Sequence, residues 1–288
     1  MKQTNLILTA MLAIALCFTA CSSSDDEPIV PEIASGTAGS LTWTLTEDGT
    51  LTISGNGTML DYDAIYNSEA NTYLSTVPWS SHINTITKVV IANGVTSIGE
   101  VAFAHCTGLT SIDVATDNPN YTSEGGVLFN KTKTTLVAYP AGKGSSYTVP
   151  SSVTSIGNTA FQGCTGLTSI TLPSSLTSIG NSAFVYCTGL TSITLPSSLT
   201  SLGERAFYNC TGLTSITLPS SLTSIGNSAF LDCTGLTEIT VEAIVPPAVS
   251  TNTFYNVSRT IPVYVPVGSL AAYQSANYWK EFTNIIGV

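Results

Sequence analysis

Hydrophobic and polar positions recur with a single spacing through most of this chain. Leu167, Leu190 and Leu213 open three consecutive blocks of 23 residues, and the blocks are nearly identical. They read LTSITLPSSLTSIGNSAFVYCTG, LTSITLPSSLTSLGERAFYNCTG and LTSITLPSSLTSIGNSAFLDCTG. Partial copies in the same register precede and follow them, so we predict a repeat region over residues 86–254.

Each block begins with a pattern that is typical of a short strand. In the first block, Ile170 and Leu172 alternate with polar residues, so they point to one side of the strand and face the core. Pro173 ends this strand. Leu176 and Ile179 follow as a second inward-facing segment.

The remainder of the block predicts a turn and a second set of core residues. We expect Gly180 to turn the chain with an unusual backbone angle. Ala183 and Phe184 are expected to fill the far side of the core, and Cys187 closes the coil as a small hydrophobic residue. Because no block can bury these residues alone, neighbouring blocks must stack, strand on strand at about 4.8 Å. This predicts a mainly β, right-handed solenoid with a parallel β-sheet along one face.

Residues 34–85 do not follow the repeat and predict an N-terminal β cap. Leu41–Leu45 and Thr50–Gly55 alternate with period two, and Glu47–Gly49 between them is a hairpin turn signal. We expect this hairpin to cover the open edge of the first coil, with Trp79 leading into that coil.

One coil within the repeat region is predicted to be irregular. Cys106 and Cys164 are 58 residues apart, which is one period and 35 residues more. Val127–Phe129 and Thr135–Tyr139 read as strands, so a β-hairpin is expected to elaborate this coil within 113–150.

The C-terminal residues 255–288 depart from the repeat and predict a short strand and helix cap. Ile261–Pro266 reads as a strand, and Ser269 is placed as the N-cap of a helix. Phe282–Val288 is expected to help close the last coil.

The spacing AF-x-x-C-x-x-L-x-x-I-x-L-P-x-x-L-x-x-I-G resembles the BspA-like (Treponema-type) leucine-rich repeat, and it covers about 86–254. The arrangement of the N-terminal cap is similar to that family as well. The resemblance implies a surface lipoprotein of the Bacteroidetes kind, because members are cell-surface adhesins and related cell-envelope proteins.

The N-terminus predicts export and a lipid anchor. Residues 1–20 combine Lys2, an apolar run of 13 residues from Leu6 to Phe18 and small residues before Cys21, which is the pattern of a signal peptide. The apolar run is too short to span a bilayer of about 30 Å as a helix. The residues before Cys21 resemble a bacterial lipobox, which implies that Cys21 carries the acyl chains. The alternative is an ordinary secretory signal that is cleaved nearby.

Residues 21–33 read as a flexible acidic linker, because they are rich in Ser, Asp and Glu. The linker resembles the Ser-plus-acidic export tag of Bacteroidetes surface lipoproteins, while a plain solvated spacer is the alternative. The expected location is the outer membrane, lipid-anchored and facing the cell exterior.

Composition and charge exclude two classes of partner. Only 9% of residues are charged, and the net charge is −10 with eight Lys plus Arg. A nucleic-acid binder needs a basic patch that neutralises phosphates, and this chain offers none. The same argument counts against binding to anionic lipid headgroups, so we expect membrane contact only through the N-terminal lipid.

Candidate chemistry is sparse, and we predict no enzyme, no cofactor, and neither catalytic nor metal-binding residues. The two histidines, His82 and His105, lack convergent partners, and His105 occupies a variable position that reads as surface. The repeat cysteines could form disulfides in an exported chain, but they number five and recur once per coil, which favours a ladder of buried thiols. They are Cys106, Cys164, Cys187, Cys210 and Cys233.

A binding surface is the remaining functional candidate. The outward strand positions, together with two aromatic residues that read as exposed, define a candidate binding face: Ser169, Thr171, Ser192, Thr194, Ser215, Thr217, Tyr186 and Tyr208. Glu238 and Thr240 extend the strand row at one end, and Ser111 and Asp113 at the other. The alternative is that Ser and Thr simply satisfy a solvated sheet.

The sequence therefore predicts a cell-surface, lipid-anchored leucine-rich-repeat binding protein. We expect it to be adhesin-like and to recognise host or neighbouring-cell proteins or glycans. A glycan-capture lipoprotein that supports polysaccharide uptake is the alternative, and the identity of the ligand and the oligomeric state stay open.

Overall fold

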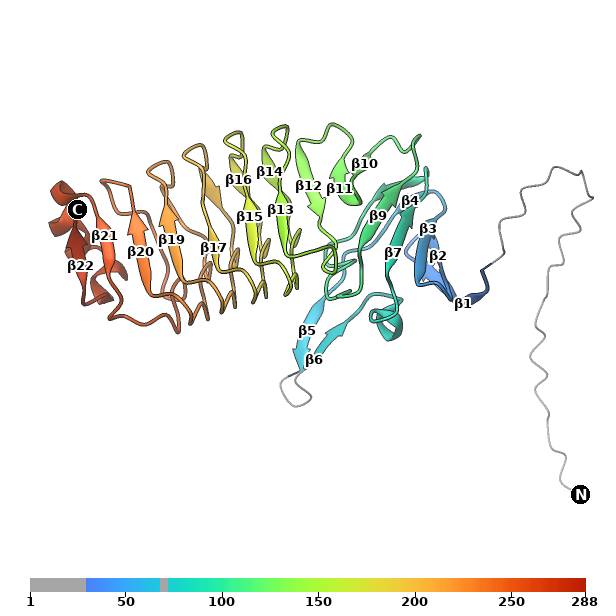
Figure 1. The fold of residues 1–288 in the computed structure, drawn as a ribbon, viewed down its shortest axis with the longest axis horizontal. Coiled ribbons are helices and arrows are strands. Elements are labelled where there is room, and N and C mark those ends of the chain that lie inside the picture. Colours follow the sequence, from blue (N-terminus) through green and yellow to red (C-terminus); the bar gives the residue numbers. More distant parts are fainter. Residues whose placement is uncertain (1–29, 68–71) are drawn as a thin grey trace, which may run out of the picture. The chain divides into compact units, whose positions relative to one another are not determined.

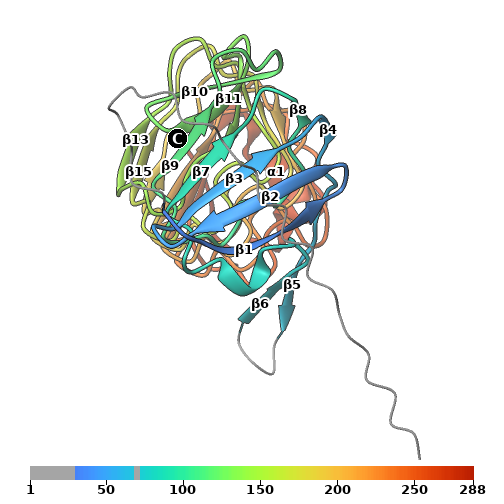
Figure 2. The ribbon, with the colours of Figure 1, turned by 90° about the vertical axis from the view of Figure 1, so that its right-hand side faces the viewer.

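Strands from successive coils lie side by side along the unit Pro31–Val288 (Figure 1). The structure is a computed structural model that describes residues 30–67 and 72–288, without the side chains of 64–75. The chain winds through stacked coils whose strands pair in parallel along two of their sides, with strand caps at both ends (Figures 1 and 2). The expected fold class, a mainly β leucine-rich-repeat solenoid, is confirmed.

The first side of each coil carries the strand that the Leu-x-x-Ile pattern predicts. These strands pair in parallel with one full repeat between partners, so that Ser169 faces Ser192 and Ile170 faces Ile193. A parallel bridge between Thr194 and Thr217 continues the row. The strands of the first side after the irregular coil are β13 (Ser146–Thr148), β15 (Ser169–Thr171), β17 (Ser192–Ile193), β19 (Ser215–Leu218), β20 (Glu238–Val241), β21 (Val263–Val265) and β22 (Ile285–Gly287).

The second side carries a shorter parallel ladder. Ser178 pairs with Ser201 and Ile179 with Leu202, again one repeat apart. Its strands in the repeat are β14 (Ser155–Ile156), β16 (Ser178–Ile179) and β18 (Ser201–Leu202). Ile179 is buried, as its place in the inward-facing pattern predicts.

The third side has no regular strand, yet its backbone is hydrogen-bonded from coil to coil. The Phe184 amide donates to the Ala206 carbonyl over 2.8 Å, and Phe161 makes the same 2.8 Å bond to Ala183. The buried rings of Phe161, Phe184 and Phe207 stack with centroids 4.8 and 5.1 Å apart. The predicted row of phenylalanines therefore forms the centre of the core.

The prediction that Gly180 turns the chain with an unusual backbone angle is wrong. Gly180 is absent from the residues with positive φ, whereas Ser182 and Tyr186 on the third side have φ of 56° and 61°. Gly180 is required for another reason: a Cβ there would lie 2.6 Å from Asn158 Oδ1 in the preceding coil. Close stacking of the coils, and not a left-handed turn, demands glycine at this position.

The N-terminal cap continues the first side beyond the coils. The antiparallel strands β2 (Leu41–Thr46) and β3 (Thr50–Ser54) are the predicted hairpin, and β3 pairs in parallel with β7 (Lys88–Ile91) of the first coil. β1 (Glu32–Ala38), which the sequence did not indicate, adds an outer antiparallel strand. β7 then pairs in parallel with β9 (Ser111–Val114).

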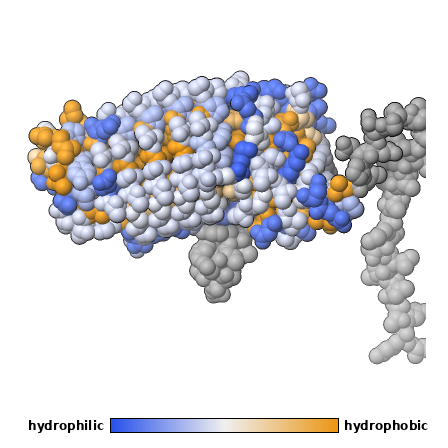
Figure 3. Space-filling view, viewed as in Figure 1, coloured by the Kyte–Doolittle hydropathy of each residue, from blue (hydrophilic) through white to orange (hydrophobic). Residues whose placement is uncertain are grey.

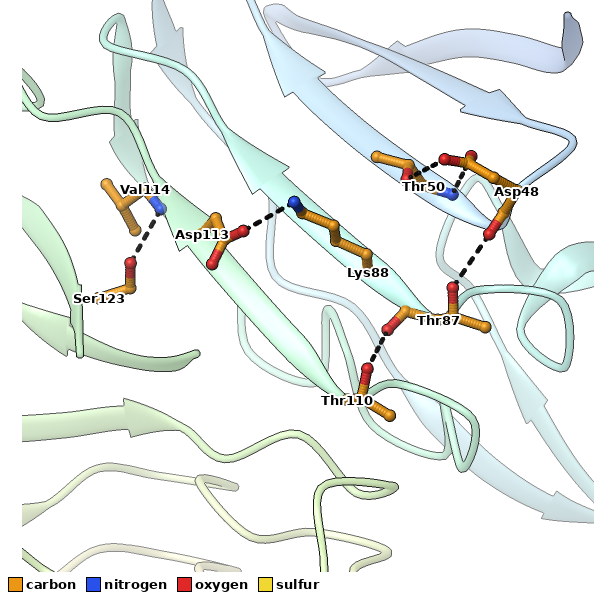
Figure 4. A network of polar contacts seen from close by, with 8 residues as sticks. All are labelled: Asp48, Thr50, Thr87, Lys88, Thr110, Asp113, Val114 and Ser123. Carbon is orange, nitrogen blue, oxygen red and sulfur yellow. Dashed lines mark hydrogen bonds and ion pairs between the residues drawn. The ribbon is translucent and has the colours of Figure 1, made fainter. Parts of the chain in front are cut away.

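Side-chain contacts fasten this cap to the coils (Figure 4). The Thr87 hydroxyl donates to the Asp48 carbonyl over 3.2 Å, and the Thr110 hydroxyl donates to the Thr87 carbonyl over 3.0 Å. Lys88 and Asp113 pair across neighbouring strands with 2.9 Å between Nζ and Oδ2. The cap and the first coils thus share one network along the first side.

Three further short elements complete the N-terminal region. β4 (Gly57–Thr58) pairs with β8 (Val95–Ser97) of the first coil. β5 (Ala64–Asn67) and β6 (Thr72–Ser75) form an antiparallel hairpin that projects from the body (Figure 2). The 3-10 turn η1 (Ser80–His82) follows the fully buried Trp79.

The irregular coil contains the expected hairpin and one strand more. β11 (Val127–Asn130) runs antiparallel to β12 (Thr135–Ala138), and β12 joins β14 in parallel. β10 (Tyr121–Glu124) pairs with the other edge of β11. Three strands of this coil therefore extend the second side.

The C-terminal cap follows the predicted order of strand and helix. α1 (Leu270–Ser275) lies between the 3-10 turns η2 (Val267–Ser269) and η3 (Trp279–Glu281). Ser269 occupies the N-cap position, but its hydroxyl donates to the Pro266 carbonyl over 2.7 Å and makes no cap hydrogen bond. Trp279 is buried and contacts the ring of Phe254, so it closes the phenylalanine row.

Candidate binding surfaces

Six of the predicted site residues lie outward on the first side, where we call them the hydroxyl face. They are Ser169, Thr171, Ser192, Thr194, Ser215 and Thr217. The first four of them are exposed, and Ser215 and Thr217 on β19 are half-buried. In the part of the chain that the structure describes, none of these six hydroxyls hydrogen-bonds to another protein group. The face is therefore free to exchange its water for a ligand.

Hydroxyls at the corner before the first side behave differently. Thr168, Thr191 and Thr214 each donate to the carbonyl one repeat earlier, over 2.9, 3.2 and 3.2 Å. Thr177 and Thr200 make the same contact before the second side. The corner hydroxyls therefore serve the stack by satisfying backbone carbonyls, whereas those of the hydroxyl face are left to the solvent.

The flanks of the hydroxyl face are more charged than its centre. Asp113, expected to extend the face toward the N-terminus, is engaged by Lys88, and Glu238 extends it toward the C-terminus. In Figure 3, strongly hydrophilic residues gather over the N-terminal part, whereas the regular coils are mostly pale with hydrophobic residues exposed along their middle. A ligand of the central face meets few charges.

Tyr186 and Tyr208 do not belong to the hydroxyl face. Both lie on the third side and are half-buried, so the expectation that they are exposed beside the strand hydroxyls is wrong. Their rings meet edge to face with centroids 5.3 Å apart. Tyr186 has a positive φ of 61°, whereas Tyr208 does not, so the two tyrosines reach the third side from different backbone conformations.

The two tyrosines line a groove of about 580 Å³, which we call the third-side groove. Gln162, Arg205 and Asn227 line it with them, each from a different coil. A second cavity of about 200 Å³ adjoins it and shares the lining residues Glu100, Val101, Thr159 and Gln162. Sequence reasoning missed this groove, although the variable pair before each repeat cysteine already marked the positions of both tyrosines.

Burial changes the acid–base properties of this side. Burial is the main cause of the raised pKa of Tyr208, and a side-chain hydrogen bond with Tyr186 that favours the protonated hydroxyl adds to it. Burial lowers the pKa of His105, whose ring lies 6.2 Å from that of Tyr186. His105 is half-buried, so its assignment to the surface is wrong. Both groups are uncharged at neutral pH.

The five repeat cysteines are buried free thiols, as predicted. Cys187, Cys210 and Cys233 donate to the phenylalanine carbonyl of the preceding coil over 3.1, 3.0 and 3.0 Å. The thiol therefore fills a small core site and satisfies a buried carbonyl at once. Burial raises the pKa of Cys106 and of Cys233 to about 12.

The described residues were compared with what a metal site or a membrane-spanning helix requires. Across residues 30–67 and 72–288, no three His, Cys, Asp or Glu side chains converge as metal ligands would. The helices in the same residues are too short or too polar to cross a bilayer. The predicted signal peptide (1–20), the predicted lipidation site Cys21 and most of the linker lie outside the described residues.

The stacked coils with one Leu-x-x-Ile strand each define a leucine-rich-repeat solenoid. A family model described as BspA type leucine rich repeat region matches residues 80–145 and 138–260, in six copies. The chain belongs to this BspA-type leucine-rich-repeat family. No curated protein matches the chain.

Solved structures of leucine-rich-repeat proteins resemble the chain at low sequence identity. The pneumococcal vaccine antigen PcpA is 24% identical, with a TM-score of 0.60 over 70% of this chain and 56% of that one. This chain thus spans little more than half of the PcpA structure. A leucine-rich repeat protein from Eubacterium ventriosum is 22% identical over 88% of this chain and 93% of that one, with a TM-score of 0.42. The Treponema pallidum protein TpLRR is 22% identical over 85% and 92%, with a TM-score of 0.35.

Proposed function

We propose that this protein is a cell-surface, adhesin-like binding protein that holds a host or neighbouring-cell macromolecule against its hydroxyl face. One observation carries the proposal: the hydroxyls of this face are not used by the fold, whereas those at the corners are. Solenoids of this kind supply long binding surfaces rather than enclosed reaction sites.

The geometry of the face favours a partner with polar groups spread over an extended surface. Successive strands place their hydroxyls about 4.8 Å apart, in parallel register from Ser169 to Ser192. Each hydroxyl can donate and accept a hydrogen bond, so the row can bind both donor and acceptor groups of a protein loop or a sugar chain. Single hydrogen bonds contribute only about 1 kcal/mol, so affinity must come from several coils together.

The export signal supports display outside the cell. We propose that Cys21 carries the lipid, and that the acidic linker directs the protein to the outer face of the outer membrane. Replacing Cys21 with Ala should abolish incorporation of labelled palmitate and release the chain from the membrane fraction. Protease added to intact cells should digest the wild-type protein. A Cys21→Ala protein that still incorporated palmitate would show that the anchor lies elsewhere.

Binding is tested with the chain that lacks residues 1–21, against matrix proteins, mucin and whole cells. We expect at least one of these to bind, and the double variant Ser192→Ala/Thr194→Val to weaken that binding about thirtyfold, because two hydrogen bonds contribute about 2 kcal/mol. Ser197→Ala is the matched control: Ser197 is exposed on the turn that follows β17, outside the hydroxyl face. Failure of every surface to bind, or equal loss with Ser197→Ala, would contradict the proposal.

The glycan-capture alternative gains one observation of its own. Its expected aromatic residues are absent from the hydroxyl face but present in the third-side groove, as Tyr186 and Tyr208.

A further inference from the structure

The third-side groove is a second surface with a different character from the hydroxyl face. It draws its lining from successive coils, with Glu100 from the first coil, Gln162 from the coil before Tyr186, and Arg205 with Tyr208 from the next. The coil spacing on this side follows the stacked phenylalanines, whose centroids lie 4.8, 5.1 and 5.4 Å apart. The groove therefore offers side chains at a regular interval along its length.

The polar groups of the groove retain hydrogen-bonding capacity. Within the described residues, the Gln162 amide makes no hydrogen bond to the protein. Asn227 accepts a 2.6 Å bond from Ser250 at Oδ1, which leaves its two amide hydrogens for a ligand. Arg205 has only a loose contact of 3.9 Å with Glu204. Amides, a guanidinium and the Glu100 carboxylate thus point to a partner rich in neutral donors and acceptors.

The two tyrosines supply the apolar part of the recognition. Their rings meet edge to face at 65°, and both residues are half-buried, so part of each stays accessible from the groove. The negative face of an aromatic ring attracts weakly positive C–H groups, and the C–H face of a sugar ring is such a surface. Sites that combine aromatic faces with a few placed polar groups fix the orientation of small ligands.

Charge excludes an anionic ligand. Asp63 and Glu100 line the groove, and Arg205 is its single cationic side chain among the described residues. The chain as a whole carries a net charge of −10. An acidic polysaccharide or a phosphorylated chain would meet repulsion along most of its length.

From these features we infer that the third-side groove binds a neutral oligosaccharide chain, with Tyr186 and Tyr208 stacking on sugar rings and Gln162, Asn227 and Arg205 bonding their hydroxyls. Sugar rings in an extended chain repeat at a length close to the coil spacing, so successive rings meet successive coils. This site is separate from the hydroxyl face and does not depend on it.

The test is electrophoresis of the chain lacking residues 1–21 through gels that contain one soluble neutral polysaccharide each: mixed-linkage β-glucan, galactomannan, arabinoxylan or pullulan. Retardation by at least one of them is expected. Tyr208→Ala and Tyr186→Ala should weaken that interaction at least tenfold, whereas Tyr208→Phe, which keeps the ring, should stay within about threefold. Tyr255→Ala is the matched control, because Tyr255 is 55% exposed and lies outside the groove.

Thermal melts of each variant show whether it still folds. Gln162→Ala is included because it changes a groove residue without removing an aromatic ring. It should weaken retardation severalfold with an unchanged melting temperature. The inference would be overturned if none of the four polysaccharides retarded the protein, or if Tyr186→Ala and Tyr208→Ala were both retarded as strongly as the wild type. Ser192→Ala/Thr194→Val should leave retardation unchanged, so failure at the groove and failure at the hydroxyl face are distinguishable.

Discussion

Replacing Phe184 with Ala tests the register on which the whole fold depends. Phe184 is fully buried, and its ring lies between those of Phe161 and Phe207, at 4.8 and 5.1 Å and within 12° of parallel. Truncating a buried phenylalanine to alanine typically costs about 3–5 kcal/mol, with the smaller values at sites that can collapse.

This site has little freedom to collapse. Backbone bonds of 2.8 Å from Phe161 to Ala183 and from Phe184 to Ala206 fix the spacing between coils on both sides of the lost ring. The neighbouring rings therefore cannot move together, and the variant loses two ring contacts of about 0.5–1.5 kcal/mol each besides the buried area. We therefore expect Phe184→Ala to lower the free energy of unfolding by about 4–5 kcal/mol, near the upper end of the range for such truncations.

Urea unfolding followed by far-ultraviolet circular dichroism measures this loss as a lower midpoint with an unchanged slope. Ser192→Ala, on the open hydroxyl face, should change the free energy of unfolding by less than about 0.5 kcal/mol. If Phe184→Ala lost less than about 1 kcal/mol, or if both variants unfolded at the same midpoint, the placement of the phenylalanine row would be refuted.

Two further predictions concern the stack and its thiols. Gly203→Ala should destabilise the protein by more than about 2 kcal/mol in urea unfolding, because its Cβ would lie 2.5 Å from the Gly180 carbonyl carbon, whereas Gly166→Ala, with no atom within 4 Å, should be nearly neutral. Burial raises the pKa of the Cys106 thiol from 9.0 to about 12, so its contribution to stability is complete below pH 9 and is lost as the pH rises toward 12. The free energy of unfolding in urea should be constant from pH 7 to 8.5 and fall above pH 9, by up to about 1.4 kcal/mol per pH unit for each buried thiol, and the urea midpoint should fall with it.

Each of these two predictions has its own contrary result. Equal destabilisation by Gly203→Ala and Gly166→Ala would show that close approach of the coils is not the reason for glycine. A midpoint that stays constant through pH 10, or rapid alkylation of the thiols in the native protein at pH 8, would contradict their burial.

The repeat made the core predictable. Phe184 and Cys187 occupy positions that recur every 23 residues, and only stacking buries such a row, so their place in the core followed directly from spacing. The hairpin of the N-terminal cap could be predicted equally well, because alternation and a turn signal are local properties of the sequence. β1 was not, since its strand exists only because β2 offers an edge to pair with.

The candidate site was harder to predict than the core. The outward positions of β15 and β17 followed from alternation, but nothing in the sequence distinguishes their uncommitted hydroxyls from the engaged hydroxyls of Thr168 and Thr191. The difference depends on which carbonyls of the preceding coil lie within reach. The sequence indicated correctly that position 180 requires glycine, but the expected reason, a turn, was wrong. A glycine that is needed for close approach of two coils looks the same in sequence as one that is needed for a turn.

The sequence by itself determined the period, the inward row of each coil and the solenoid that must follow, because burial of a periodic apolar pattern has few solutions. Only the tertiary structure decided which side each polar side chain occupies. It placed Tyr186 and Tyr208 together on the third side, in a groove shared by several coils. The backbone there adopts positive φ at positions such as Ser182 and Tyr186, whose residue types vary from coil to coil, so the sequence pattern does not reveal it.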